Sequence, residues 1–313
     1  MTIRSKQTLG DTVFRVVLTA FALVIPAVML ALVLELGLQA WPSITRFGAK
    51  FLFTSTWDPV AEIYGAAPMI FGTLVSSLLA VLLAVPLAVG TAVFLTEFSP
   101  AWMRRTVGTL VELLAAIPSV VYGLWGIFVL IPLLRRVVVP VLEATLGWTP
   151  LVSGEFYGNS MIAAAFILAI MILPYIATVS REVLQAVPTS QRDAALALGA
   201  TRWEAVWSVQ LPYARTGIVG AIILGLGRAL GETMAVTMVI GNRHEISTSI
   251  LQPGYTMASV IANEFAEATT SLYLSALFEI GLVLFGVTVV VNAFARLLVW
   301  RVARGSAAGS TAL

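Results

Sequence analysis

Two residues of opposite charge interrupt a long apolar run near residue 230 of this sequence. Arg228 and Glu232 lie in the segment GLGRALGETMAV, and their spacing places them on one face if the segment is helical. An arginine at the centre of a membrane costs at least about 2.5–3.5 kcal/mol, so it needs polar surroundings and a partner. A guanidinium held beside a carboxylate in such a place can pair with a passing anion.

Two carboxylates compete as the partner of Arg228. Glu232 follows in the same run, and Glu279 lies in the last apolar run at a similar calculated depth, about 12 Å against about 13 Å from the outer face. Glu112 lies shallower, about 8 Å from the inner face. We therefore take Arg228, Glu232 and Glu279 as candidates for a substrate path. The alternative is a buried ion pair that only fixes helix packing.

The composition indicates an integral membrane protein. Of its 313 residues 59% are hydrophobic and 11% are charged, whereas soluble domains carry about 25% charged residues. The lack of cysteine and the single histidine, His244, argue against a metal centre or a Ser-His-Asp triad, so we predict no metal and no cofactor. No basic tract suggests nucleic acid, and no G-x-x-x-x-G-K-[ST] loop occurs. The chain is therefore not expected to be an enzyme, and any ATPase activity would belong to a separate partner subunit.

Long apolar runs define the elements that must position these charges. Only helices and closed barrels satisfy backbone groups in lipid, and these runs are too long and too uniform for barrel strands. We therefore predict an all-α polytopic membrane protein with six transmembrane helices. The runs cover residues 14–38, 69–96, 107–134, 160–180, 216–240 and 272–299.

The charges that flank these runs predict the orientation. With the N-terminus in the cytoplasm, twelve lysines and arginines lie inside and five outside. Both termini are therefore expected in the cytoplasm, and the first run is interpreted as a retained anchor. The segment 41–68 then lies outside, where Trp41, Trp57 and Tyr64 are expected to anchor in the membrane interface.

A polar stretch between the fourth and fifth runs, residues 193–212, falls on the cytoplasmic side. It is predicted to form two short helices separated at Gly199, which favours the left-handed conformation at a helix end. Thr201 and Glu204 have the spacing of a capping box for the second helix. Pro212 is expected to end that helix, because its nitrogen cannot donate a hydrogen bond. The stretch is either a docking element or a solvated linker.

This stretch resembles the cytoplasmic loop of type I ABC importer permeases. The family pattern is E-A-A, a glycine four residues later, nine residues and then I-x-L-P; here Asp replaces Glu and Val replaces Ile. The matching residues are Asp193, Ala194, Ala195, Gly199, Val209, Leu211 and Pro212. In that family the loop docks into a groove of the ATPase subunit. The resemblance therefore implies the type I ABC importer (MetI-like) permease fold and an ATPase-coupling loop at residues 188–212.

A second resemblance narrows the family. Residues 225–236, together with residues 112–126, 240–242 and 262–268, are similar to PstC-type permeases of bacterial phosphate ABC importers. This implies a permease subunit that moves inorganic phosphate across the bacterial cytoplasmic membrane, with Arg228 and Glu232 at positions implicated in transport. It also implies a PstA-like permease, a PstB-like ATPase dimer and a PstS-like phosphate-binding protein as partners, besides membrane lipid.

The sequence leaves other functions open. The PstA-like partner itself, or a permease for another oxyanion such as sulfate or molybdate, shares the importer features. A secondary transporter or channel acting alone is the alternative from a different class, and the 188–212 loop argues against it. The predicted organisation is a tail and first helix at 1–40, an outer loop at 41–68, the permease domain at 69–300 and a cytoplasmic tail at 301–313.

Overall fold

Helices form most of the chain that the structure describes. This computed structural model covers residues 9–307. Six helical stretches within these residues are long and apolar enough to cross a membrane, which confirms the prediction of an all-α protein with six spans. They are Val13–Phe47, Ala67–Phe98, Ser119–Leu146, Met161–Gln185, Arg202–Leu230 and Ser271–Leu297.

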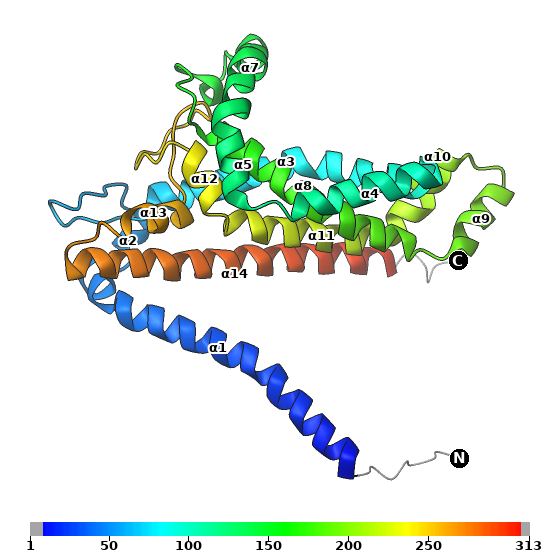
Figure 1. The fold of residues 1–313 in the computed structure, drawn as a ribbon, viewed down its shortest axis with the longest axis horizontal. Helices are drawn as coiled ribbons and strands as arrows, with labels where there is room; N and C mark the ends of the chain where they lie inside the picture. Colours follow the sequence, from blue (N-terminus) through cyan, green and yellow to red (C-terminus); the bar gives the residue numbers. More distant parts are fainter. Residues whose placement is uncertain (1–8, 308–313) are drawn as a thin grey trace.

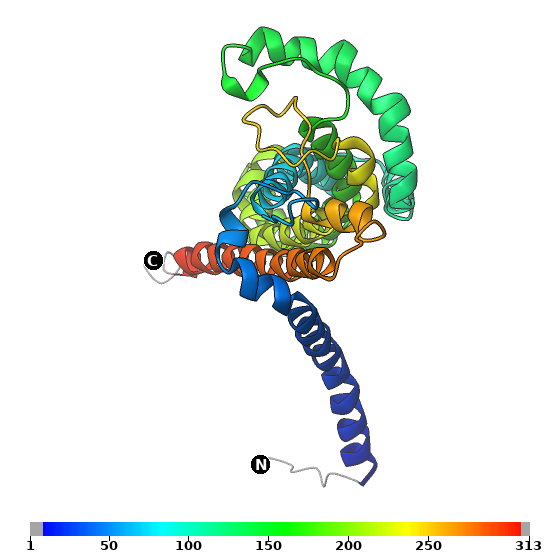
Figure 2. The same ribbon diagram turned by 90° about the vertical axis from the view of Figure 1, so that its left-hand side faces the viewer.

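Four long helices lie side by side and form the core of the molecule (Figure 1, Figure 2). They are α3 (Ala67–Val93), α8 (Met161–Gln185), α11 (Leu211–Leu230) and α14 (Ser271–Ala307). Small residues let α3 approach α8: Ala80, Ala84 and Ala88 are fully buried in one cluster with Ile167 and Ile172. Since lipid tails are as apolar as these side chains, close van der Waals packing is what favours helix contact over lipid contact.

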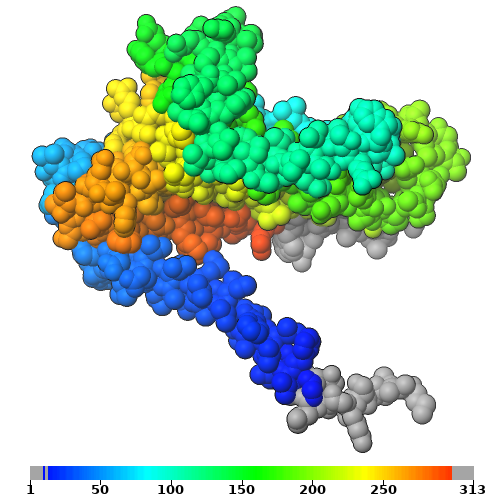
Figure 3. All heavy atoms as spheres, viewed as in Figure 1, coloured from blue at the N-terminus to red at the C-terminus, as the bar shows by residue number. Residues whose placement is uncertain are grey.

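The first helix, α1 (Leu9–Phe47), leaves this bundle. Part of it packs against α14, and its N-terminal half stands clear of the other helices (Figure 1, Figure 3). No residue of its most apolar 18-residue window is buried in the described chain. Such a helix needs lipid or a neighbouring membrane helix around it, because water would contact its apolar surface at a high cost.

The predicted run at 107–134 is not one helix. The helix α4 (Ala101–Ala115) follows the bundle and ends before Pro118, whose ring disfavours helical backbone in the residue before it. The chain then turns across the bundle axis as a helical arm, residues 119–146 (Figure 1, Figure 2). The arm consists of α5 (Ser119–Trp125), η2 (Gly126–Leu130), α6 (Ile131–Leu133), η3 (Leu134–Val138) and α7 (Val139–Leu146). Of these, η2 and η3 are wide, π-helical turns.

The predicted run at 216–240 is also divided. A continuous helical stretch runs from α10 (Arg202–Ala205) through the wide turn η5 (Val206–Gln210) into α11. Residues 231–233 leave the helix, and α12 (Met234–Val239) begins beyond them. The remaining short helices are α2 (Lys50–Phe53), η1 (Phe94–Phe98), η4 (Pro150–Val152), α9 (Thr189–Ala197) and α13 (Met257–Glu264).

An aromatic cluster covers the end of the bundle opposite α9 and α10. Trp57 and Tyr64 pack there with Tyr273 of α14. Trp57 is 8% exposed and Tyr64 is 1% exposed, so the prediction that these two side chains anchor in the membrane interface is wrong. The cause is a polar contact: Trp57 Nε1 donates a 2.7 Å hydrogen bond to the buried carboxylate of Glu264. Trp41 is 63% exposed, so for this residue the prediction stays open.

Candidate functional site

Arg228 lies at the point where α11 ends. It occupies the last turn of that helix, and Glu232 lies in the following break, where its Oε1 accepts a 3.4 Å hydrogen bond from the Ala235 backbone. The prediction of one uninterrupted helix here is therefore wrong. The two charges nevertheless remain close, with Arg228 Nη2 4.0 Å from Glu232 Oε2. Among the described residues, Glu232 is the only carboxylate within 4.0 Å of this guanidinium.

The ring of Tyr175, in α8, packs against the guanidinium of Arg228. Its ring centroid lies 4.8 Å from Arg228 Cζ, which is the geometry of a cation–π contact. Its hydroxyl donates to the Ala115 carbonyl at 3.3 Å, so the ring is fixed to the end of α4. Gly225 makes this arrangement possible, because a Cβ there would lie 2.8 Å from the Ile176 side chain and would push α11 away from α8.

The break after α4 meets the break after α11 in this region. Besides Tyr175, the hydroxyl of Tyr122 donates to a carbonyl at the end of α4, that of Leu114, at 2.7 Å. Freed carbonyls at membrane depth need such donors, since no bulk water is available in the hydrocarbon core. Two interrupted helices and α8 therefore meet around Arg228.

The two charged side chains differ in accessibility. The side chain of Arg228 is 36% exposed and that of Glu232 is 8% exposed. A reachable guanidinium can accept an oxyanion as a ligand through two parallel hydrogen bonds. The more buried carboxylate of Glu232 is held by the Ala235 backbone N–H at the start of α12. From this fixed position it balances the charge of Arg228 and repels an anion bound there. The arrangement is thus suited to transient pairing with an anion.

Glu279 lies elsewhere. It is 6% exposed on α14, one turn from Ser275, whose hydroxyl accepts a 3.0 Å hydrogen bond from the Ser43 backbone of α1. The part of α14 that faces Gly227 is at Asn292, thirteen residues further on, or about 20 Å along the helix. The similar depths calculated for Arg228 and Glu279 are therefore wrong, because α14 has 37 residues and is much longer than a membrane-crossing segment.

The stretch predicted to dock forms two helices as expected. Gly199 separates them with a φ of +90°, and Thr201 and Glu204 make the full capping box, with Thr201 N donating to Glu204 Oε2 at 2.7 Å. Pro212, however, does not end the second helix. The Leu211 N–H bonds to the carbonyl of Val206, five residues back, and this wider turn accommodates the proline.

The loop presents an exposed and apolar tip on a fixed base. No residue of α9 is buried, and Leu198 is 90% exposed. The base is held by an ion pair of 3.1 Å between Arg192 Nη1 and Glu97 Oε2, and the Glu97 side chain is only 8% exposed. Asp193 points outward, with 67% of its side chain exposed. An exposed element that is fixed at its base by an ion pair can receive a partner and pass on its displacement.

A buried carboxylate ties together the opposite end of the molecule. Glu264 accepts hydrogen bonds of 2.7 Å from both Trp57 and Tyr273, and His244 Nε2 lies 2.9 Å from its other oxygen. Burial alone would raise the pKa of Glu264, but the hydrogen bonds from His244, Tyr273 and Trp57 outweigh it and lower the pKa. The segment 41–68, the 241–256 loop and α14 therefore share one ionised anchor.

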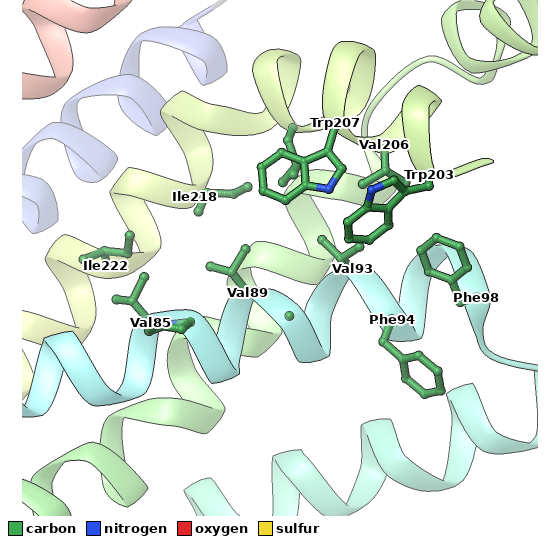
Figure 4. Close-up of a pocket in the computed structure, with 13 residues that line it drawn as sticks. Val85, Val89, Val93, Phe94, Phe98, Trp203, Val206, Trp207, Ile218 and Ile222 are labelled. Carbon is green, nitrogen blue, oxygen red and sulfur yellow. The ribbon is translucent and has the colours of Figure 1, made fainter. Parts of the chain in front are cut away.

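One groove of the described chain lies apart from Arg228. It measures about 570 Å³ and lies between α3 and the α10–α11 stretch, with Trp203 and Trp207 facing Val89, Val93 and neighbouring side chains (Figure 4). Its lining residues are all uncharged, so it offers nothing to balance a bare oxyanion. Such a groove suits lipid tails or an apolar helix.

Comparisons with known proteins agree with this architecture. The sequence profile of the family described as "Binding-protein-dependent transport system inner membrane component" matches residues 84–304. The phosphate transport system permease protein PstC of Pasteurella multocida is 46% identical over 93% of this chain and 92% of its own length. The protein of the same name from Xylella fastidiosa is 45% identical over 94% of this chain and 92% of its own.

Solved structures give the fold. A bacterial alginate ABC transporter aligns over 95% of this chain and 98% of its own, with a TM-score of 0.62 at 15% identity. The methionine ABC transporter MetNI aligns over 79% of this chain and 99% of its own, with a TM-score of 0.56 at 17% identity. Both are ABC transporters, which confirms the type I importer permease fold. From its sequence and its fold, the chain belongs to the PstC family of permeases, within the inner membrane components of binding-protein-dependent transport systems.

Proposed function

We propose that this chain is the permease subunit that carries inorganic phosphate into the cytoplasm within an ATP-driven, binding-protein-dependent importer. The observation that carries the proposal is the placement of Arg228, whose partly exposed guanidinium lies at the meeting point of two interrupted helices. Intramembrane charges are expensive and are retained for function by default. The names of the PstC relatives support phosphate as the anion.

Arg228 offsets the phosphate charge during passage. Two N–H groups of the guanidinium can donate to two oxygens of one phosphate. The Tyr175 ring packs against the guanidinium and holds it in place. Glu232, 4.0 Å away, competes for the same donors and repels the anion. Binding is therefore favourable enough for entry but too weak to prevent release, which transport requires.

The loop at residues 188–212 is proposed to couple this path to ATP. With both termini in the cytoplasm the loop faces the ATPase, and its contact residues are Asp193, Ala194, Ala195, Gly199, Val209, Leu211 and Pro212. Since α10, η5 and α11 form one continuous stretch, a displacement of the loop is carried along α11 to Arg228. This direct mechanical link is a consequence of Pro212 being accommodated within the helix.

The proposed assembly has four kinds of subunit. A PstA-like permease pairs with this chain and covers the exposed part of α1, a PstB-like dimer hydrolyses ATP, and a PstS-like protein delivers phosphate at the end of the bundle that Glu264 stabilises. The chain itself is not an ATPase. We assign residues 1–40 to a tail and anchor helix, 41–68 to an external loop, 69–300 to the permease domain and 301–313 to a cytoplasmic tail, in the bacterial inner membrane.

Reconstitution tests this function. The four components are placed in liposomes with ATP inside, and uptake of radiolabelled phosphate is compared with uptake of sulfate and molybdate. ATP-dependent phosphate uptake that requires the binding protein is expected. Uptake of only sulfate or molybdate would transfer the chain to another oxyanion. Uptake by the purified chain without the ATPase would make it a secondary transporter and overturn the proposal.

A further inference from the structure

A second group of arginines lies in a pocket between α4 and the end of α8. The pocket measures about 330 Å³, near the lower end of the range of about 300–1,000 Å³ that is usual for ligand sites. Its polar lining residues are Arg104, Arg105, Thr109, Glu112, Arg181 and Gln185. Three guanidinium groups thus face a single carboxylate, and this excess of positive charge attracts an anion.

Arg181 is the most enclosed of the three arginines. Its side chain is 21% exposed and its Nη2 lies 3.3 Å from Glu112 Oε1, whose side chain is 56% exposed. Its Nε is buried and has no hydrogen-bond partner within the described chain. Gly108 of α4 makes room for it, because a Cβ at that position would overlap Arg181 Nη1.

The other two arginines come from the N-terminal part of α4. Arg104 Nη2 donates to the Thr96 carbonyl at 2.9 Å, which fixes its guanidinium at the edge of the pocket. Arg105 follows directly on the same exposed turn and completes the rim. A tetrahedral oxyanion has three or four acceptor oxygens, so it can bridge guanidinium groups that converge from two helices.

The pocket and Tyr175, the residue that supports Arg228, both lie where α4 meets α8. Tyr175, which supports Arg228, bonds to Ala115 of α4, and Arg181 bonds to Glu112 of the same helix. Arg181 lies six positions after Tyr175 in α8, or about 9 Å along the helix towards α9. The pocket therefore lies on the α9 side of the Tyr175–Arg228 contact, which is the side from which an anion leaves if α9 faces the cytoplasm.

We propose that the pocket formed by Arg104, Arg105 and Arg181 is a second phosphate-group site, on the exit side of the path. This assignment to the exit side rests on the proposed function and orientation. The ligand is either free inorganic phosphate after it passes Arg228 or the phosphate of an anionic lipid headgroup, since basic pockets at the cytoplasmic face bind both by the same chemistry.

Binding is measured with the membrane-bound complex, without the soluble phosphate-binding protein, in nanodiscs of phosphatidylcholine and with radiolabelled inorganic phosphate. An Arg228→Gln background removes the central site, so that the exit pocket is tested whether or not Arg228 carries substrate. Arg181→Gln is expected to weaken binding about 10- to 100-fold, the loss typical of hydrogen bonds to a charged group. Gly108→Ala keeps every charge but displaces Arg181 and is expected to act in the same direction. Arg15→Gln, on the exposed part of α1, is the matched control and leaves binding unchanged.

A second arm identifies the source of the phosphate group. The same variants are placed in nanodiscs that contain phosphatidylglycerol, and retained lipids are counted by native mass spectrometry. Arg181-dependent binding of phosphate assigns the site to substrate, and Arg181-dependent retention of one lipid assigns it to a headgroup. If Arg181→Gln does not assemble, Arg105→Gln on the exposed rim takes its place. Equal binding of both ligands to the parent, the pocket variants and the control would overturn the proposal, whatever uptake assays say of Arg228.

Discussion

Replacement of Gly199 by alanine costs free energy only through the backbone conformation. The φ of Gly199 is +90°, and a Cβ placed there would meet nothing within 4 Å, so an alanine clashes with no neighbour. A residue with a side chain still loses about 1–2 kcal/mol in left-handed backbone. A cost of this size lowers the population of the native turn about 5- to 30-fold relative to competing loop conformations. Gly199→Ala is therefore expected to displace the exposed tip at Leu198.

Coupling is the property to measure. Phosphate uptake and ATP hydrolysis are followed in the same proteoliposomes, and their ratio is expected to fall several-fold in Gly199→Ala while ATP hydrolysis persists. Gly286→Ala is the matched control, since Gly286 also has nothing within 4 Å of its added Cβ but lies inside α14 with helical backbone. Alanine there is neutral or slightly stabilising. An unchanged ratio in Gly199→Ala would refute the docking role of the loop.

Two further predictions concern Tyr175 and Glu264. Tyr175→Leu removes a cation–π contact worth about 0.5–2 kcal/mol, so phosphate uptake should fall about 2- to 30-fold. Tyr175→Phe keeps the ring and should keep most of the uptake. Equal loss of uptake in both variants would refute the role of the ring in positioning Arg228. Because the folded pKa of Glu264 is lowered, its stabilisation is complete above the unfolded carboxyl pKa and is lost as the pH falls through the folded one. Glu264→Gln should therefore lower the unfolding free energy by about 1.5–3 kcal/mol at neutral pH and by less in acid, measured by thermal unfolding followed by tryptophan fluorescence. Glu267→Gln, at an exposed position, is the control. A difference that does not change with pH would contradict the role of Glu264 as an ionised anchor.

The class of fold could be predicted from the sequence because hydropathy and length leave few solutions in lipid. The apolar runs had to be helices, and their flanking polar segments had to lie outside the hydrocarbon. The capping box at Thr201 was equally predictable, since it depends on residues three apart in the chain. Local rules of this kind need no knowledge of the tertiary structure.

The breaks and the partners of Arg228 could not be predicted in the same way. Pro118 and Pro212 carry the same local signal, yet α4 ends before the first and a wide turn accommodates the second, because the neighbouring backbone decides where the missing hydrogen bond is tolerated. Tyr175 gave no signal, since nothing in its apolar run connects it with a residue 53 positions later. Glu279 was misplaced because depth was counted from the ends of the runs.

Phosphate uptake by Arg228→Gln, measured beside assembly of the complex, tests the proposed path most directly. Arg228→Lys is included, because lysine keeps the charge but loses the fork that pairs with two oxygens. We expect Arg228→Gln to co-purify with its partner subunits in normal yield and to hydrolyse ATP, but to take up no phosphate, with Arg228→Lys intermediate. Normal uptake by Arg228→Gln would contradict the substrate role, and loss of assembly would show instead that Arg228 and Glu232 form a packing ion pair.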